Sequence, residues 1–326
     1  MPHSGLVIAW LISFLVGGLR GEDYPVDDPL YWKQKPYLKA INLPAAWKRL
    51  WGTKKRRERV TVALVDTGVY KHPDIAGNLV TGYNVTGKNT DTDDKQGHGT
   101  QVAGILGATL NNNLLIAGVA DLVDIMPIAI RYPFTQDQMT DAVDYVISNR
   151  QKHNIKILLM AASSNTIQKA LALKVQEAVN AGLLLVVTVG NHGQNVTANK
   201  RWPCALTIKL DGMLCVGGMA QTEMRISRQS NYANYLDIAA PGDKITTLTK
   251  DFKFTDISGS SAASAIVAGV AALVYSISPH LTSREVKGIL KDTATKGVED
   301  PSYKEILPFG RVDANKAIEK AEALKL

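Results

Sequence analysis

Apolar segments of strand length alternate along the chain with segments whose apolar residues recur at helical spacing. Val60 to Val65 is a short, continuous apolar run of the kind found in buried strands. The same pattern predicts strands over residues 124–130, 155–161 and 183–189 and helices over 136–150, 167–181, 261–276, 283–293 and 313–324. Strands separated by helices usually pair in parallel, because a parallel connection must cross the length of the sheet. The alternation therefore predicts an α/β fold, with a mostly parallel central sheet and helices on both faces.

The composition is that of an ordinary globular protein with enough apolar residues for a large core. Of the 326 residues, 45% are hydrophobic and 21% are charged, and neither a repeat nor a convincing second domain is evident. The net charge of +7 is common among soluble basic proteins. Nucleic-acid binding would favour basic residues interleaved with aromatic ones, and the sequence has no such motif. We therefore expect no nucleic-acid partner.

The first 21 residues are predicted to be a secretory signal peptide. An apolar run from Leu6 to Leu19 is followed by small residues and then by the acidic pair Glu22 and Asp23. A membrane anchor is the alternative, but the run is shorter than the roughly 20 residues that span a bilayer. We therefore predict a secreted protein with no membrane anchor after the signal is removed.

Residues 22–46 are predicted to form an extended N-terminal extension, and residues 47–326 the main domain. The extension contains four prolines, which disfavour a long helix. A run of mostly basic residues, Lys54 to Arg59, then precedes the first strand. We interpret this run as a solvated loop, and the alternative is a processing site for a protease that cuts at paired basic residues.

The chain has two cysteines, Cys204 and Cys215. In a secreted protein such a pair suggests a disulfide. An Asp-Gly turn signal lies between them, so a bridged hairpin is one interpretation and two free buried thiols are the other. Two sequons, at Asn84 and Asn195, are N-glycosylation acceptors if the host glycosylates.

Three polar residues lie where an α/β sheet would expose functional groups. Asp66 ends the first strand, His98 lies between two glycines just before a small-residue helix, and Ser261 lies at the start of another such helix. Each alone is commonly structural, as a turn former, a satisfied polar residue or a helix cap. Together they can form a nucleophilic serine, a histidine base and a carboxylate that orients the histidine.

At these motifs the chain resembles the subtilisin-like serine peptidases. Residues 65–69, 97–104 and 259–265 are similar to the family's aspartate, histidine and serine motifs, in the family's order. Residues 189–193 resemble the segment that carries an oxyanion-hole asparagine, here Asn191. The resemblance covers roughly residues 36 to 320. It implies a secreted serine endopeptidase, acting as a monomer on proteins or peptides, in which Ser261 is the nucleophile, His98 the base, and Asn191 an oxyanion donor.

The sequence departs from the family pattern at four positions around these motifs. Ser260, Ala262 and Ala265 stand where the family usually has Thr, Met and Pro, and Gln101 stands where a second histidine is usual. The segment before the domain is also shorter than the family's usual inhibitory propeptide. These departures motivate a second hypothesis, a binding protein that has lost catalysis. A nucleotide-binding enzyme is a third, but no glycine-rich phosphate motif is present.

The resemblance also implies where substrate binds. Family members hold substrate as an added strand beside a pocket. Residues Ala161, Ala162 and Ser163 would form one wall of that pocket, and Thr188, Val189 and Gly190 the other. Ser163 and Ser164 replace glycines that are usual in the family. Asp93 and Asp94 precede the histidine motif and either favour a basic residue near the cut or belong to a solvated acidic loop.

A structural calcium ion is the one cofactor that the resemblance implies. Calcium prefers six to eight oxygen ligands, which carboxylates, amides and backbone carbonyls provide. The matching positions are the side chains of Asp74 and Asn112 and the carbonyls of Leu110, Leu114 and Ile116. Gln34 is a further candidate ligand, and the alternative is a metal-free loop whose asparagines form turns.

Overall fold

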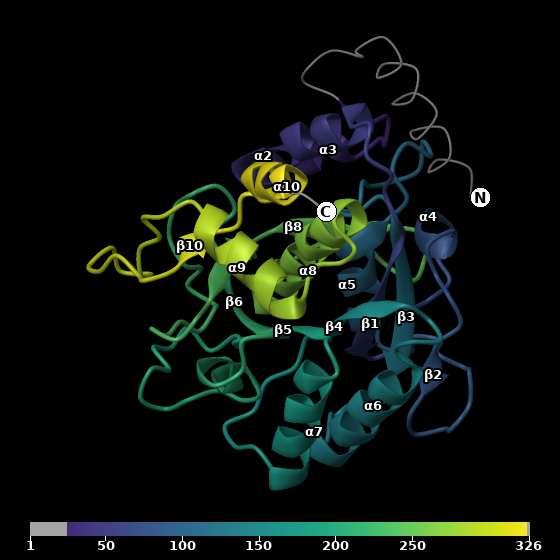
Figure 1. The fold of residues 1–326 in the computed structure, drawn as a ribbon, viewed down its shortest axis with the longest axis vertical. Coiled ribbons are helices and arrows are strands. Elements are labelled where there is room, and N and C mark those ends of the chain that lie inside the picture. Colours follow the sequence, from purple (N-terminus) through teal and green to yellow (C-terminus); the bar gives the residue numbers. More distant parts are fainter. Residues whose placement is uncertain (1–24, 325–326) are drawn as a thin grey trace, which may run out of the picture.

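A computed structural model describes residues 25–324 and contains a parallel eight-stranded sheet as its largest element of strand structure (Figure 1). The strand order is β10-β7-β6-β5-β4-β1-β3-β2, and every neighbouring pair is parallel. The strands are β1 (Val60–Asp66), β2 (Tyr83–Asn84), β3 (Val123–Ala129), β4 (Ile155–Met160), β5 (Leu184–Thr188), β6 (Met213–Met219), β7 (Ile238–Pro241) and β10 (Gly310–Arg311). The predicted α/β fold is confirmed.

Helices cover both faces of the sheet, because its strands carry apolar side chains on both sides. On β1, Val62 and Leu64 face one core cluster and Ala63 and Val65 the other. Helices α6 (Gln136–Asn149) and α7 (Lys169–Asn180) pack on one face (Figure 1). The other face carries α5 (His98–Gly107), α8 (Ser260–Ile277), α9 (Ser283–Thr293) and α10 (Ala314–Ala323).

Helix α8 is the central core helix. Every one of its 18 residues is buried, and it packs against β1, β4, β5, β6 and β7. Its length and apolarity would suffice to cross a membrane, but the whole helix is enclosed by the described chain. The predicted signal peptide, residues 1–21, lies outside the described residues.

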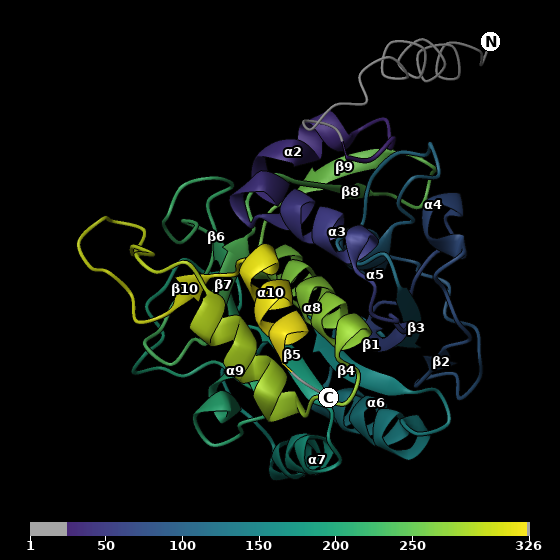
Figure 2. The same ribbon diagram turned by 45° about the horizontal axis from the view of Figure 1, so that its top comes forward.

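The prediction of an extended N-terminal segment was wrong. Residues in this region form α2 (Tyr31–Ala40) and α3 (Leu43–Gly52), and α3 crosses the predicted boundary at residue 46. Pro36 lies inside α2 and removes one helical hydrogen bond, which the burial of Tyr31, Tyr37 and Leu38 offsets. Pro44 lies in the first turn of α3, where the missing N–H costs little. Figure 2 shows α3 beside α10, so the two ends of the described chain pack together.

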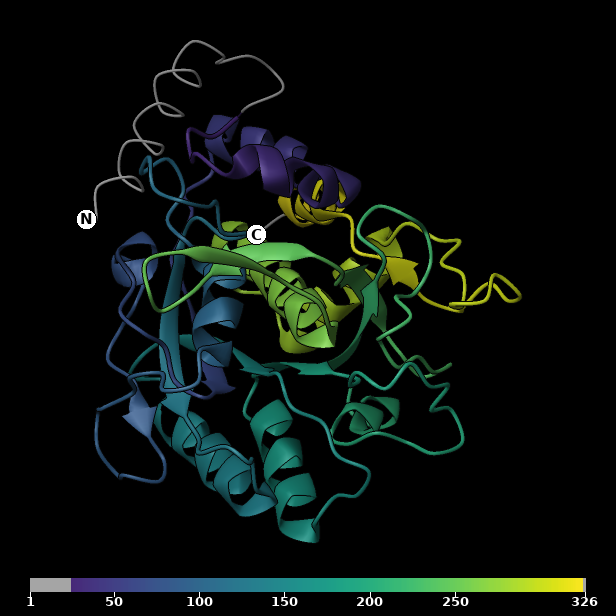
Figure 3. The same cartoon turned by 180° about the vertical axis from the view of Figure 1, so that it is seen from behind.

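A separate two-stranded hairpin packs across α5 (Figure 3). Strands β8 (Ile245–Leu248) and β9 (Phe254–Ile257) pair antiparallel. Thr247 Oγ1 donates to the carbonyl of Gln101 in α5. A Cβ at Gly104 of α5 would approach Thr247 Oγ1 to 2.9 Å, so a glycine at this position allows the close packing. Between β1 and β2, the chain forms the short helix α4 (Pro73–Ala76).

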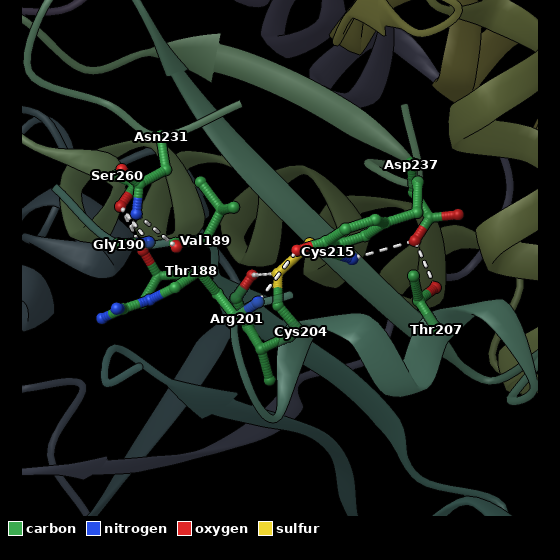
Figure 4. Close-up of a disulfide and its surroundings, with 12 residues drawn as sticks. Thr188, Val189, Gly190, Arg201, Cys204, Thr207, Cys215, Asn231, Asp237 and Ser260 are labelled. Carbon is green, nitrogen blue, oxygen red and sulfur yellow. Dashed lines mark hydrogen bonds between the residues drawn. A yellow bond between two sulfur atoms is a disulfide. The ribbon is translucent and has the colours of Figure 1, made fainter. Parts of the chain in front are cut away.

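The two cysteines form a disulfide (Figure 4). Their Cα atoms are 4.9 Å apart. The predicted hairpin between them was wrong, because Cys204 begins the 3₁₀ helix η1 (Cys204–Ile208) and Cys215 lies within β6. Apolar strand β6 was missed because its Gly-rich end lacks a clear strand pattern.

The basic run before β1 is a loop in which Lys54, Arg56, Glu58 and Arg59 are exposed, as expected, but two of its arginines form ion pairs. Arg57 forms two hydrogen bonds to the carboxylate of Asp121, at 2.7 and 2.6 Å. Arg59 pairs with Asp124 at 2.8 Å. These contacts fix the chain as it enters the central strand.

Candidate active site

The site lies at the carboxyl edge of the sheet, where β1 ends at Asp66. The Asp66 side chain is 1% exposed, and its Oδ1 lies 2.7 Å from Nδ1 of His98. The same oxygen accepts a hydrogen bond from the Thr67 N–H at 2.7 Å. A Cβ at Gly99 would collide with the carbonyl of Gly68, so glycine after His98 allows α5 to begin directly against the end of β1.

The electrostatic environment favours the protonated form of His98. Burial alone would lower the pKa of this imidazole, but the charge and hydrogen bond of Asp66, with a smaller contribution from Asp94, outweigh it. The pKa of His98 is therefore raised above its ordinary value. The His98 side chain remains 37% exposed, so it stays accessible from solvent.

Ser261 lies in the first turn of α8. The hydrogen bonds from Ser260, the first residue of α8, to Asn191 place this helix start beside the carboxyl end of β5. Ser261 is 7% exposed. Its N–H belongs to the first turn, where N–H groups have no acceptor within the helix. Within the described chain no hydrogen bond joins Ser261 Oγ to His98. Such contacts are often long before substrate binds.

Asn191 follows β5 and is held by the residue before the predicted nucleophile. Its Oδ1 accepts hydrogen bonds from both the N–H and the hydroxyl of Ser260, each at 2.7 Å. The carboxamide nitrogen therefore points away from Ser260 as a remaining donor. A Cβ at Gly259 would lie 2.8 Å from this nitrogen, and the backbone there has φ +150°, so only glycine fits without strain.

Ser260 itself is fully buried and links three segments of the site. Its hydroxyl accepts hydrogen bonds from Thr188 Oγ1 and, at 3.1 Å, from the Gly190 N–H (Figure 4). The serine that replaces the family's usual threonine therefore keeps the hydroxyl that positions Asn191.

The two predicted substrate walls lie on neighbouring strands, β4 and β5, at their carboxyl ends. Within the described chain the backbone of Ala162 and Ser163 makes no hydrogen bond with other segments, so it remains available to an extended peptide. The other wall is already bonded: Asn231 donates its side-chain N–H to the Val189 carbonyl at 3.1 Å and its backbone N–H to the Gly190 carbonyl at 2.8 Å. The carbonyls of Val189 and Gly190 are therefore already engaged by Asn231.

The two aspartates before His98 differ in their surroundings. Asp94 is 1% exposed, and its carboxylate accepts hydrogen bonds from Thr67, Gln96, Gly97 and Thr100. It therefore holds the loop before α5 and is not free to face substrate. Asp93 is more exposed and pairs with Lys95 at 2.5 Å.

The residues of the predicted calcium loop lie near two buried carboxylates, Asp74 and Asp28. Asp74 accepts hydrogen bonds from the side chain of Asn112 at 2.9 Å and from the N–H of Ile116 at 3.0 Å. Burial raises the pKa of Asp74 to about 6. Burial also raises the pKa of Asp28 to about 7, with a contribution from the charge of Asp74. Such a pair gains stability from a cation between or beside the carboxylates.

The candidate ligand Gln34 is not directed at this loop. Its amide donates to the Ala117 carbonyl at 2.8 Å and accepts from the Ala117 N–H at 2.9 Å. Asp28 instead contacts the loop, accepting from the N–H groups of Asn111 at 3.1 Å and Asn112 at 3.4 Å. In the described chain no group of three or more His, Cys, Asp or Glu side chains is arranged around a metal. The carboxylates of Asp28 and Asp74 are oxygen ligands of the kind that calcium prefers.

A model of the subtilase family matches residues 57–310 of the chain. The chain belongs to this family.

Curated relatives of this subtilase agree with the assignment. Thermitase of Thermoactinomyces vulgaris is 29% identical over 91% of this chain and 100% of its own length. Subtilisin BL of Lederbergia lenta is 30% identical over 79% of this chain and 90% of its own. Thermostable alkaline protease of Halalkalibacterium halodurans is 32% identical, but the match spans only 62% of that protein.

Two solved structures share the fold. A protease of Pseudoalteromonas arctica superposes with a TM-score of 0.77 at 23% identity, covering 91% of this chain and all of the other. A cold-adapted subtilisin-like serine proteinase superposes with a TM-score of 0.68 at 26% identity, covering 81% of this chain and 92% of its own.

Two features of the subtilase site were not found from sequence. Ser260 was noted only as a departure from the family pattern, although its hydroxyl bonds to Asn191. Asp28 was not singled out, because it is separated from the calcium loop by more than 80 residues and only the folded α2 region brings them together.

Proposed function

We propose that this subtilase is a serine endopeptidase that hydrolyses peptide bonds through an acyl-enzyme on Ser261. The observation that carries the proposal is the 2.7 Å contact between Asp66 and His98 at the sheet edge where α8 carries Ser261 in its first turn. A buried carboxylate bonded to Nδ1 leaves Nε2 of the imidazole as the base.

In the first half of the reaction, Ser261 Oγ attacks the substrate carbonyl carbon and His98 takes the hydroxyl proton. Asp66 stabilises the imidazolium that forms. The Asn191 carboxamide N–H and the Ser261 backbone N–H donate to the oxyanion. His98 then returns the proton to the leaving amine as the C–N bond breaks, and the first product departs.

In the second half, a water molecule replaces the amine. His98 takes a proton from this water, whose oxygen attacks the ester carbonyl of the acyl-enzyme. The oxyanion is held by the same two donors. Ser261 regains its proton from His98, and the acid product leaves.

Hydrolysis of a protein substrate such as casein by the purified chain tests the proposal. Ser261→Ala should lower kcat by about 10³-fold or more. Ser264→Ala is the matched control, because Ser264 lies on the same helix and its hydroxyl bonds to the Ser260 carbonyl. Equal activity of wild type and Ser261→Ala would contradict Ser261 as the nucleophile, and no activity in folded wild type would favour a binding protein that has lost catalysis.

We also propose that the loop around Asp74 binds calcium as a structural ion. Support comes from the two buried carboxylates that contact the loop, Asp28 and Asp74, with Asp28 in place of the candidate ligand Gln34. The residues that would hold the ion are Asp28, Asp74 and Asn112, with the carbonyls of Leu110, Leu114 and Ile116. The bound ion would balance the buried negative charge and fix α2 to the loop.

Secretion of this subtilase is likewise a proposal. A disulfide suits an oxidising compartment, and a relative from Xanthomonas campestris is named an extracellular protease. Asn195 of the second sequon is exposed, whereas Asn84 bonds through its side chain to the Asp91 carbonyl and the Gly87 N–H. N-glycosylation is therefore expected at Asn195 before Asn84 if the host glycosylates.

A further inference from the structure

Arg201 is a buried cation without an acidic partner in the described chain. The residue is 8% exposed, and its Nε is buried without a hydrogen-bond partner. One guanidinium nitrogen donates to Asn165 Oδ1 and another, at 3.4 Å, to Ser163 Oγ. No carboxylate of the described residues pairs with it, although buried arginines are almost always paired with an acid. Burial lowers the pKa of this guanidinium, which stays charged.

The guanidinium contacts the segment after β4 that is predicted to form the first wall of the substrate pocket. Ser163, one of its two hydrogen-bond partners, belongs to the first wall. A Cβ at Gly190 of the second wall would collide with Ser163 Oγ, so the walls are in contact at this point. Figure 4 shows Arg201 beside the end of β5, where Thr188, Val189 and Gly190 lie.

Backbone pairing fixes the arginine in this position. Ser164 and Trp202 exchange two backbone hydrogen bonds of 2.8 Å, which join the segment after β4 to the segment that carries Arg201. The Arg201 N–H also donates to the hydroxyl of Tyr235 at 3.0 Å. The cation is therefore held by the fold and is not a mobile surface side chain.

The position of the predicted pocket walls relative to Asn191 indicates which substrate residue would meet Arg201. The Asn191 amide would bind the carbonyl oxygen of the residue that precedes the cut. Gly190 is the neighbour of Asn191 and lines the pocket, so the side chain of that same substrate residue enters beside Gly190. The charged groups nearest in sequence, Lys200 and His192, add no negative charge, and Asp94 is engaged in its own loop.

We propose that Arg201 makes this subtilase prefer substrates with Glu or Asp immediately before the scissile bond. The inference rests on the proposed endopeptidase function and specifies its substrate class. A carboxylate entering the pocket would accept hydrogen bonds from the guanidinium, including its unpartnered Nε, in a site that excludes water. A lysine or arginine at the same substrate position meets a like charge. This preference is the opposite of the alternative in which Asp93 and Asp94 favour a basic residue near the cut.

The test is a set of peptides that differ only in the residue before the cut: Glu, Asp, Gln, Phe or Lys. Gln matches Glu in size and lacks the charge, so the ratio of kcat/KM for Glu to that for Gln isolates the ion pair. We expect this ratio to be about 100 or more for wild type, as for buried charge pairs elsewhere. A ratio below about 3, or a preference for Phe or Lys, overturns the inference.

Variants link the preference to Arg201. Arg201→Gln should lower the Glu-to-Gln ratio to near 1 through a lower kcat/KM for the Glu peptide. Arg201→Lys keeps the charge and should retain part of the preference. Arg284→Gln is the matched control, because it removes the same charge from an exposed side chain on α9 and should leave the ratio unchanged. An unchanged ratio in Arg201→Gln contradicts the inference.

The Glu-to-Gln ratio of the wild-type protein tests the inference even if Arg201→Gln does not fold. A small fluorophosphonate that labels serine separates the two proposals. Labelling of Ser261 without a preference for Glu overturns the specificity and leaves the endopeptidase intact. Failure to label folded protein, with no peptide cleaved, contradicts the endopeptidase function itself.

Discussion

Replacement of Asn191 by Leu removes one oxyanion donor from a site that otherwise keeps its shape. Asn191 Nδ2 is the part of this carboxamide that does not contact Ser260, since Oδ1 accepts both Ser260 hydrogen bonds. Loss of one such donor typically lowers kcat by about 10²–10³-fold, or about 2.7–4 kcal/mol of transition-state stabilisation. The oxyanion exists only in the transition state, so KM should stay within a few-fold of wild type.

The same replacement has a stability cost that a second variant separates from catalysis. In Asn191→Leu the buried Ser260 N–H and hydroxyl lose their acceptor, which should cost about 1–3 kcal/mol of unfolding free energy. Asn191→Asp keeps an oxygen acceptor for Ser260 and lacks the donor. It should therefore recover stability without recovering kcat.

Steady-state kinetics on a peptide substrate and urea unfolding measure the two effects. The reasoning is refuted if folded Asn191→Leu keeps kcat within 3-fold of wild type. A rise in KM with unchanged kcat would also contradict it, because it would assign Asn191 to ground-state binding.

Three further predictions concern charge. Asp66 keeps the pKa of His98 above its ordinary value and catalysis needs neutral imidazole, so kcat/KM should fall as the pH drops through that raised pKa. In Asp66→Asn this acid limb of the pH profile should move to lower pH, and kcat should fall on the order of 10⁴-fold. An unmoved acid limb would contradict the assignment. A chelator should lower the Tm of wild type but not that of Asp74→Asn. A bound ion at 100 times its Kd adds about 2.7 kcal/mol to the free energy of unfolding, and the chelator removes this gain. Equal Tm of the wild type with and without chelator would contradict the calcium site. Asp237→Leu leaves the buried Lys287, 3.1 Å away, without its counterion and should cost about 3–5 kcal/mol of unfolding free energy, measured with denaturant. The value of kcat/KM should not change, because Asp237 precedes β7 at the edge of the sheet opposite the active site. A loss below about 1 kcal/mol or a changed kcat/KM would contradict this prediction.

Sequence pattern predicted the central strands and most helices because these elements are long and strongly periodic. The predicted ranges 60–65 and 136–150 lie within one residue of β1 and α6. Tertiary contacts decided the exceptions. The N-terminal prolines suggested extended chain, but burial of Tyr31, Tyr37 and Leu38 stabilises α2 despite Pro36.

The site was predictable only where local motifs carry it. Asp66, His98 and Ser261 each stand beside a strand end or helix start that the sequence reveals. Two contacts join segments that are distant in sequence: Asp28 with the loop near Asp74, and Arg201 with Ser163. No local pattern predicts such contacts, because they depend on how strands and loops pack. The unpaired charge of Arg201 became visible only when its surroundings were known.

Mapping the residue modified by a fluorophosphonate tests the central claim most directly. Wild-type protein, Ser261→Ala and His98→Ala are treated in parallel, digested and analysed by mass spectrometry. A single adduct on Ser261 in wild type, absent in Ser261→Ala and formed far more slowly in His98→Ala, is the predicted result. An unmodified Ser261 in folded wild type, or an adduct rate that His98→Ala does not change, would contradict activation of Ser261 by His98.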